Sequence, residues 1–182
     1  VQITLEHLLE AQMLEPRQAD LLLQALEGQK TILICGPTGS GKTTLLSALI
    51  YESGQRVICI EQTPELTLQF PAVGLREREA NQEGVGAIDS SELLRHALRM
   101  RPDRIALGEV RGKEFGTLLL AINNGHSALA TLHASSLDSL PRRLSILGLI
   151  SGLDQSLLQG LLVGAVDVVV QLASDLPRKV VG

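Results

Sequence analysis

The residues best suited to chemistry form a glycine-rich segment. It reads Gly36-Pro37-Thr38-Gly39-Ser40-Gly41-Lys42-Thr43 and matches the pattern G-x-x-x-x-G-K-[ST] at every position. In such a loop the backbone N–H groups and the start of the following helix surround phosphate groups, because both supply positive potential. The pattern assigns the lysine to the β- and γ-phosphates and the threonine hydroxyl to Mg²⁺. We therefore predict that the chain binds ATP or a related nucleoside triphosphate together with Mg²⁺.

The segments on either side of this loop support the same interpretation. Residues 31–35 are apolar and rich in β-branched side chains, which is typical of a strand buried on both faces. Residues 44–50 have the pattern of a helix, and Thr44 at its start is included among the predicted nucleotide-binding residues. A chance glycine-rich turn would not be expected between a buried strand and a helix.

Composition limits the class of protein. The chain has 182 residues, of which 45% are hydrophobic and 2% aromatic, so we predict one domain with an aliphatic core. A net charge of −4 and scarce aromatic residues argue against a nucleic-acid partner. Cys35 and Cys59 lie in apolar strand-like runs and are expected to be reduced core residues. No apolar run approaches the roughly 20 residues of a membrane span, so a membrane role would be peripheral.

Strands and helices are expected to alternate along the chain, which indicates an α/β domain with a largely parallel sheet. The expected strands are residues 31–35, 57–61, 105–108, 128–132 and 166–172, and the expected helices are residues 42–51, 90–100, 113–123, 137–150 and 154–163. Residues 62–89 are polar and are expected to form a loop or a small edge hairpin around Ala72–Arg76. We divide the chain into linker-like helices over 1–28 and an ATPase domain over 29–182. Both ends suggest a segment cut from a longer protein, since residues 178–182 resemble the start of another strand.

Two glutamates follow expected strands and could act with the phosphate loop. Glu65 lies shortly after the strand at 57–61, and Glu109 directly follows the strand at 105–108. Ligands of parallel sheets bind at the carboxyl ends of the strands, so both side chains are expected near the loop. One carboxylate would hold Mg²⁺ and the other would orient the attacking water, which is most of what phosphoryl transfer requires. The alternative for each glutamate is a solvated acid at a strand end.

Four segments together resemble the signature boxes of the secretion and pilus "traffic" ATPases, called the Walker A, Asp, Walker B and His boxes. They are residues 36–43, 60–65, 98–112 and 125–134, which occur in the family's order. The resemblance covers roughly residues 5–172. Its details are most similar to the Tad/Flp pilus assembly branch, with the conjugation-type (type IV secretion) branch a near second.

The resemblance implies a RecA-like domain, a hexameric ring and Mg²⁺-dependent ATP hydrolysis. It also implies a role in pilus assembly or protein export, driving a platform protein from the cytoplasmic face of the inner membrane. Glu109 would occupy the Walker B position near Mg²⁺, and Glu65 would be the general base. Many relatives carry aspartate where this chain has Gln62, and relatives carry an N-terminal domain before the catalytic one.

Arginines and histidines complete the candidate site. The arginines are either a solvated basic face or include one that acts on nucleotide, in its own subunit or in a neighbour; the candidates are Arg95, Arg99, Arg101, Arg104 and Arg111, with Arg76 and Arg78 as further possibilities. For Arg111 the resemblance favours a structural ion pair. His133, at a strand end, is expected to sense the γ-phosphate, whereas His126 is expected to be a core residue.

Two alternatives to a secretion motor stay open on the sequence. A DNA motor of the same fold would bind DNA with a steep salt dependence. A nucleotide-gated scaffold that binds ATP but hydrolyses little is suggested by Gln62.

Overall fold

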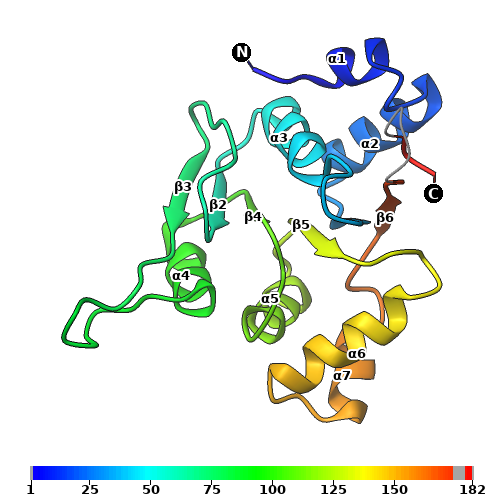
Figure 1. Cartoon of the computed structure of the whole chain (residues 1–182). Coiled ribbons are helices and arrows are strands. Elements are labelled where there is room, and N and C mark those ends of the chain that lie inside the picture. Colours follow the sequence, from blue (N-terminus) through cyan, green and yellow to red (C-terminus); the bar gives the residue numbers. More distant parts are fainter. Residues whose placement is uncertain (1, 174–178, 182) are drawn as a thin grey trace.

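A computed structural model of the chain describes residues 2–173 and 179–181 and places a parallel sheet between two layers of helices (Figure 1). The strands are β1 Ile32–Gly36, β2 Val57–Glu61, β3 Val73–Arg76, β4 Arg104–Leu107, β5 Ala128–His133 and β6 Val168–Gln171. The helices are α1 Leu5–Glu10, α2 Pro16–Glu27, α3 Lys42–Ser53, α4 Ser90–Ala97, α5 Glu114–Asn123, α6 Leu140–Ile150 and α7 Gln155–Leu162, with a 3₁₀ turn η1 at Leu98–Met100. The strand order is β3-β2-β4-β5-β1-β6 and all five pairings between these strands are parallel, which confirms the predicted α/β architecture.

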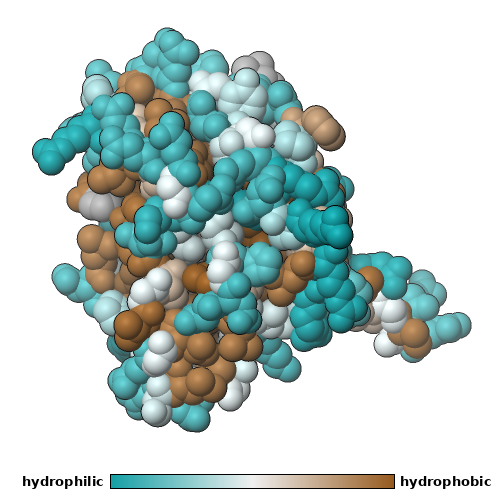
Figure 2. Space-filling view, turned by 180° about the vertical axis from the view of Figure 1, so that it is seen from behind, coloured by the Kyte–Doolittle hydropathy of each residue, from teal (hydrophilic) through white to brown (hydrophobic). Residues whose placement is uncertain are grey.

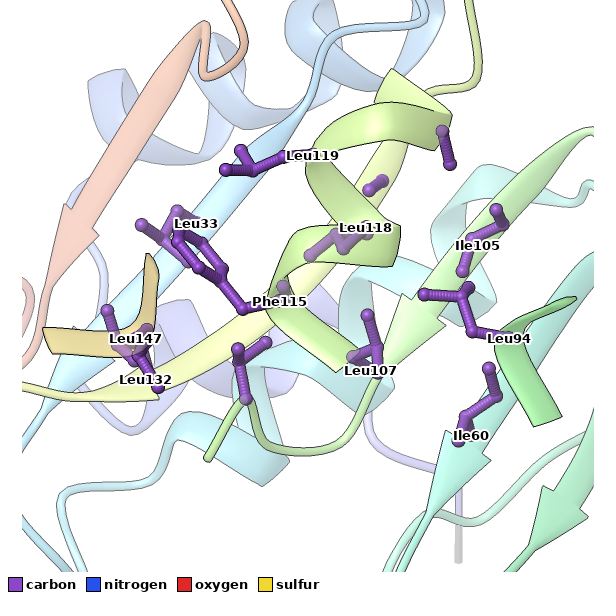
Figure 3. Packing of buried hydrophobic residues seen from close by; sticks show 14 of the residues in the cluster. Leu33, Ile60, Leu94, Ile105, Leu107, Phe115, Leu118, Leu119, Leu132 and Leu147 are labelled. Carbon is purple, nitrogen blue, oxygen red and sulfur yellow. The ribbon is translucent and has the colours of Figure 1, made fainter. Parts of the chain in front are cut away.

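The strands are buried on both faces because successive side chains point to opposite sides of a strand. In β1, Leu33 and Cys35 belong to one core cluster, whereas Ile32 and Ile34 belong to the other. Figure 3 shows the first cluster, in which Phe115 of α5 packs among side chains of the sheet. Helices α4 to α7 cover that face, and α1 to α3 cover the opposite face. Each fully buried leucine in these layers contributes roughly 1.5–3 kcal/mol to stability.

Helix ends follow local sequence signals, with two departures. Helix α2 begins at Pro16 and ends before Gly28, as predicted. The helix predicted over residues 90–100 divides into α4 and the 3₁₀ turn η1. The helix predicted from residue 137 begins at Leu140, because the Ser139 hydroxyl donates to the Ser136 carbonyl at 2.7 Å and accepts from the Ser136 N–H at 3.1 Å. Such side-chain bonds favour a turn over a helical start.

Residues 62–89 were expected to form a loop or a small edge hairpin around Ala72–Arg76, and the hairpin is wrong, because residues 73–76 form the parallel edge strand β3. β3 runs parallel to β2, with Ile58 opposite Val73 and Glu61 opposite Arg76. The Glu61 carboxylate accepts from the Glu65 and Leu66 N–H groups and so turns the chain directly after β2. Leu66 and Leu68 then pack against the core cluster on the face of the sheet that α1 to α3 cover. This packing returns the chain to the end of the sheet where a parallel strand must begin.

An arm follows β3 and projects from the body of the molecule (Figures 1 and 2). Its two sides meet at an antiparallel bridge between Arg78 and Ile88. The expected strand at the end of the chain is present in part, since Val180 forms an antiparallel bridge with Leu172; residues 178 and 182 lie outside the described residues. Among the described residues, every helix is too short or too polar to span a lipid bilayer.

Candidate nucleotide-binding site

One cleft lies at the carboxyl ends of β1, β2, β4 and β5, where the sequence placed its candidate residues. Its volume is about 570 Å³. The lining residues are Thr38, Gly39, Gly41, Lys42, Thr43, Thr44, Glu61, Gln62, Thr63, Glu65, Glu77, Ser90, Gly108, Glu109, Arg111, Gly112, Glu114, Thr131 and His133. Ligands of parallel α/β sheets bind at this edge. The cleft therefore gathers the phosphate loop, Glu65, Glu109, Arg111 and His133, which are far apart in the sequence.

The phosphate loop connects β1 to α3 and depends on glycine at two positions. Gly41 precedes α3 with φ of 96°, a left-handed conformation that side chains with a Cβ rarely adopt. A Cβ on Gly36 would lie 2.7 Å from the Ser40 Oγ and 2.8 Å from the Leu172 carbonyl oxygen. Of the predicted nucleotide-binding residues, Gly36, Pro37 and Ser40 do not line the cleft, whereas the others do.

Lys42 folds back over this loop. Its Nζ donates to the carbonyl oxygens of Gly36 at 2.9 Å and Pro37 at 2.8 Å. Burial lowers the pKa of the Lys42 ammonium, and the Glu109 carboxylate opposes that shift. The two carbonyl oxygens therefore hold the ammonium against the loop. Because both acceptors are uncharged, the charged phosphate oxygens of a nucleotide could replace them.

Thr43 and the segment after β2 are in direct contact. The Thr43 Oγ1 donates to the Glu65 Oε2 at 3.1 Å. Glu65 is held in place through its own N–H, which donates to the buried Glu61 carboxylate at 2.9 Å. Glu61 therefore fixes the backbone of this segment. Glu65 holds its carboxylate against the hydroxyl of Thr43, the predicted metal ligand.

Glu109 and Arg111 form an ion pair at the end of β4. The Arg111 Nη1 also donates to the Gln62 Oε1 at 3.0 Å, so its guanidinium connects the ends of β2 and β4. The charge-assisted bond to Glu109 raises the pKa of Arg111. The ion pair implied by the family resemblance for Arg111 is thus present in the structure.

The oxygen atoms around Thr43 suit a magnesium ion. Mg²⁺ prefers hydroxyl and carboxylate oxygens, and at such sites it is bound through one or two carboxylates, water and substrate phosphates. The Thr43 hydroxyl and the carboxylates of Glu65 and Glu109 all line the cleft, so it offers oxygen atoms of the kind that Mg²⁺ takes as ligands. Among the described residues, no three acidic, histidine or cysteine side chains form a metal site by themselves. The arrangement therefore fits a metal that is brought in with a nucleotide.

His133 lies at the end of β5 against the phosphate loop. Its Nδ1 is 3.5 Å from the Thr38 Oγ1, and the ring is exposed to the cleft. Beneath it, the Thr131 Oγ1 donates to the Gly108 carbonyl at 2.5 Å, which connects β5 to the residue before Glu109. His126 does not line the cleft; its N–H donates to the Ala121 carbonyl at the end of α5.

Arg99 and Arg101 do not line the cleft of their own chain. Both are exposed and lie in or just after η1, before the amino end of β4, whereas the cleft is at the carboxyl ends of the strands. Arg104 is wholly buried, with 1% of its surface exposed. Its guanidinium donates to the carbonyl oxygens of Leu26 at 3.0 Å and Lys30 at 2.6 Å. A role on its own nucleotide is therefore ruled out for Arg104 by burial, and for Arg99 and Arg101 a role across a subunit boundary stays a prediction.

Three acidic residues of the cleft were missed by sequence reasoning. Glu61 shapes the segment after β2, as described above. Glu114 accepts from the N–H groups of Arg111 at 2.5 Å and Gly112 at 2.8 Å. Glu77 follows β3 and accepts from the Ser90 N–H at 2.8 Å, at the start of α4. Position at a strand end was a signal for both Glu61, the last residue of β2, and Glu77, which directly follows β3. Glu77 was missed because β3 was not recognised as a parallel strand.

Comparison with known proteins places the chain in a family. The family described as "Type II/IV secretion system protein" matches residues 1–180, and the chain belongs to it. A Mycobacterium tuberculosis protein named for conjugal transfer is 42% identical over 166 residues, which cover 89% of this chain and 47% of that protein. The type IV secretion system protein VirB11 of Bartonella quintana is 40% identical over 157 residues, covering 82% of this chain and 44% of that protein. The chain thus spans about half the length of the relatives it matches.

Solved structures agree with this assignment. The VirB11 ATPase of the Brucella suis type IV secretion system, determined with sulphate, has a TM-score of 0.79 and 32% identity, covering 98% of this chain and 53% of that one. The pilus retraction motor PilT, determined with bound ADP, has a TM-score of 0.65 and 28% identity over 84% of this chain and 45% of that one. The fold is therefore the RecA-like ATPase fold of secretion ATPases, as predicted. The choice of the Tad/Flp branch stays a prediction.

Proposed function

We propose that this chain is the catalytic domain of an ATPase that hydrolyses Mg²⁺-ATP to drive protein secretion, conjugation or pilus assembly. The observation that carries the proposal is the cleft itself, which brings a complete phosphate loop together with Thr43, Glu65, Glu109 and His133. Membership of the type II/IV secretion family supports the biological setting. The proposed working form is a hexameric ring at the cytoplasmic face of the inner membrane, where it acts on a platform protein.

In this proposal each side chain has one task. The loop N–H groups and Lys42 bind the β- and γ-phosphates, and Thr43 with Glu109 holds Mg²⁺. The bound metal would neutralise charge that develops on the phosphates. Glu65 accepts a proton from the attacking water, since its carboxylate lies beside Thr43 and is anchored through Glu61. His133 reports the state of the γ-phosphate to β5, because its ring touches the loop at Thr38.

The test is nucleotide binding and phosphate release by the wild type and by Lys42→Ala. The variant should lose ATP binding or hydrolysis while its circular dichroism and thermal unfolding stay unchanged, because Lys42 contributes charge rather than core packing. Lys30→Ala is the matched control, since Lys30 is an exposed lysine before the amino end of β1, where it pairs with Asp167. Full hydrolysis by a normally folded Lys42→Ala protein would refute the assignment of the phosphate loop.

A nucleotide-gated scaffold is the second candidate. It is favoured by the ion pair of Arg111 with Glu109, which engages a carboxylate that the motor would need for Mg²⁺. Phosphate release measured with Mg²⁺ and with EDTA separates the two functions. A scaffold would bind ATP in both conditions and release little phosphate in either, whereas the motor would release phosphate with Mg²⁺.

A further inference from the structure

Among the residues that the structure describes, Arg111 is the one arginine that lines the cleft, and it is bonded to two acceptors of different charge. One side of its guanidinium pairs with the Glu109 carboxylate. The other side donates to the neutral amide oxygen of Gln62 at 3.0 Å. A guanidinium has five N–H donors, so these two bonds leave donors for a third group in the cleft.

The backbone beneath Arg111 is held firmly, whereas its side chain is not. The Arg111 and Gly112 N–H groups donate to the buried Glu114 carboxylate, and the Val110 N–H donates to the Thr131 carbonyl at 2.8 Å. The Arg111 side chain, by contrast, is 62% exposed. Movement at this site therefore belongs to the guanidinium, which can change acceptors without disturbing the strands.

The cleft is strongly acidic, which makes the charge at position 62 important. Its lining includes the carboxylates of Glu61, Glu65, Glu77, Glu109 and Glu114, against the cations of Lys42 and Arg111. A carboxylate at position 62 would add the attraction of an opposite charge to a bond whose guanidinium donor is already ionised. The amide of Gln62 holds it more weakly and adds no negative charge.

We propose that Gln62 is a positioning residue: an uncharged anchor that keeps Arg111 in the cleft when the Glu109 carboxylate is given over to the metal of Mg²⁺-ATP. Arg111 serves as the cation on Glu109 while the nucleotide is absent. When Glu109 is released, the guanidinium remains attached to Gln62 and its spare donors face the phosphates. This inference rests on the proposed function and adds to it a residue that sets the Mg²⁺ requirement of nucleotide binding.

The experiment measures equilibrium binding of a fluorescent ATP analogue to the whole chain as Mg²⁺ is titrated, with EDTA as the starting point. Gln62→Glu changes the charge of the anchor with almost no change in size. It should draw Arg111 from Glu109 and lower the half-saturating Mg²⁺ concentration about two- to fivefold, the worth of an exposed ion pair. The matched control is Gln82→Glu, the same substitution on the exposed arm away from the cleft. The control should leave the Mg²⁺ titration unchanged.

The decisive arm repeats Gln62→Glu in an Arg111→Ala background, with Arg111→Gln as a second background should the alanine variant unfold. If Gln62 acts through Arg111, the shift should disappear there. A shift of the same size without Arg111 would show a simple effect of added charge and overturn the inference, as would the absence of any shift in Gln62→Glu alone. Failure of the wild type to bind nucleotide at every Mg²⁺ concentration would instead refute the proposed function, and the inference with it.

Discussion

Arginines at the two ends of β4 have opposite roles. The side of the sheet where the strands end is called the carboxyl edge here, and the side where they begin is called the amino edge. At the carboxyl edge, Arg111 is exposed, charged and bonded to the side chains of Glu109 and Gln62. At the amino edge, Arg104 is buried, and the carbonyl oxygens of Leu26 and Lys30 are among its acceptors. Leu26 lies in the last turn of α2, where helix carbonyls lack intrahelical partners. One edge of the sheet is thus arranged for a ligand, and the other for holding α2 to the strands.

Arginine number or spacing would not reveal this difference, because both residues lie within a few positions of β4. The two arginines differ in their position relative to the short strand β4. Arg104 begins β4 and Arg111 follows its end, so the sheet holds them at opposite edges. In an α/β sequence, the arginines that precede a strand must therefore be separated from those that follow it before a role in catalysis is assigned, because ligands bind at the carboxyl ends of the strands.

The largest expected effect concerns Arg99 and Arg101, which lie before the amino end of β4 and are predicted to act on the site of a neighbouring subunit. In the proposed hexameric ring, a double variant Arg99→Ala/Arg101→Ala should lower ATP turnover about 10³–10⁵-fold if one of these arginines completes a neighbour's site. Mixing these subunits with Lys42→Ala subunits, each inactive alone, should recover part of the activity. No recovery at any ratio, with co-assembly shown by pull-down, would leave both arginines as parts of a solvated surface.

Within the carboxyl edge, two glutamates should separate by role. Glu65→Gln should reduce hydrolysis about 10²–10⁴-fold, the usual worth of a positioned general base, with ATP affinity little changed. Glu109→Gln should instead raise the Mg²⁺ concentration needed for binding, since it removes a predicted metal ligand. Steady-state hydrolysis and Mg²⁺ titrations of both variants provide the measurement. Identical Mg²⁺ curves would contradict this division of roles.

The difference between Arg104 and Arg111 can be measured directly through the free energy of unfolding of their alanine variants. Arg104→Ala should lower the free energy of unfolding by about 1–3 kcal/mol, because it leaves a cavity and removes the guanidinium donors from the carbonyl oxygens of Leu26 and Lys30. Arg111→Ala should cost less than about 1 kcal/mol, as expected for an exposed ion pair. Urea denaturation of the two variants gives both values. Equal losses would mean that the two edges do not differ as described.

The smallest expected effect concerns the two buried cysteines, Cys35 of β1 and Cys59 of β2. Burial raises the pKa of the Cys35 thiol to about 11 and that of Cys59 to about 12. Between about pH 9 and pH 11 the unfolded chain therefore loses thiol protons that the folded chain keeps, so stability should fall as pH rises. By pH 10 the loss should be roughly 1 kcal/mol per cysteine.

Urea unfolding at pH 8 and pH 10 measures this loss. The comparison protein is Cys35→Ala/Cys59→Ala, which should lose that part of the pH dependence while keeping any contribution from lysine and tyrosine groups. A pH dependence identical to that of the wild type would show that the thiols ionise equally in both states.

Sequence alone determined the features that are local. The phosphate loop was predictable because its glycines, lysine and threonine are neighbours in the chain, and the α/β class followed from apolar strands that alternate with helical periodicity. The boundaries of α2 were predictable because proline and glycine act on the backbone within one turn. The placement of Glu65 and Glu109 in one cleft followed from a general property of parallel sheets.

Tertiary structure decided what depends on strand order and direction. The order β3-β2-β4-β5-β1-β6 brings Gln62 within a hydrogen bond of Arg111 although 49 positions separate them. Parallel pairing of β3 places Glu77 at the cleft, where an antiparallel hairpin would reverse that strand. Burial of Arg104 against the end of α2 is a contact between segments that no local pattern joins. These features depend on packing between distant segments, and packing energy is a property of the folded chain rather than of any short stretch of its sequence.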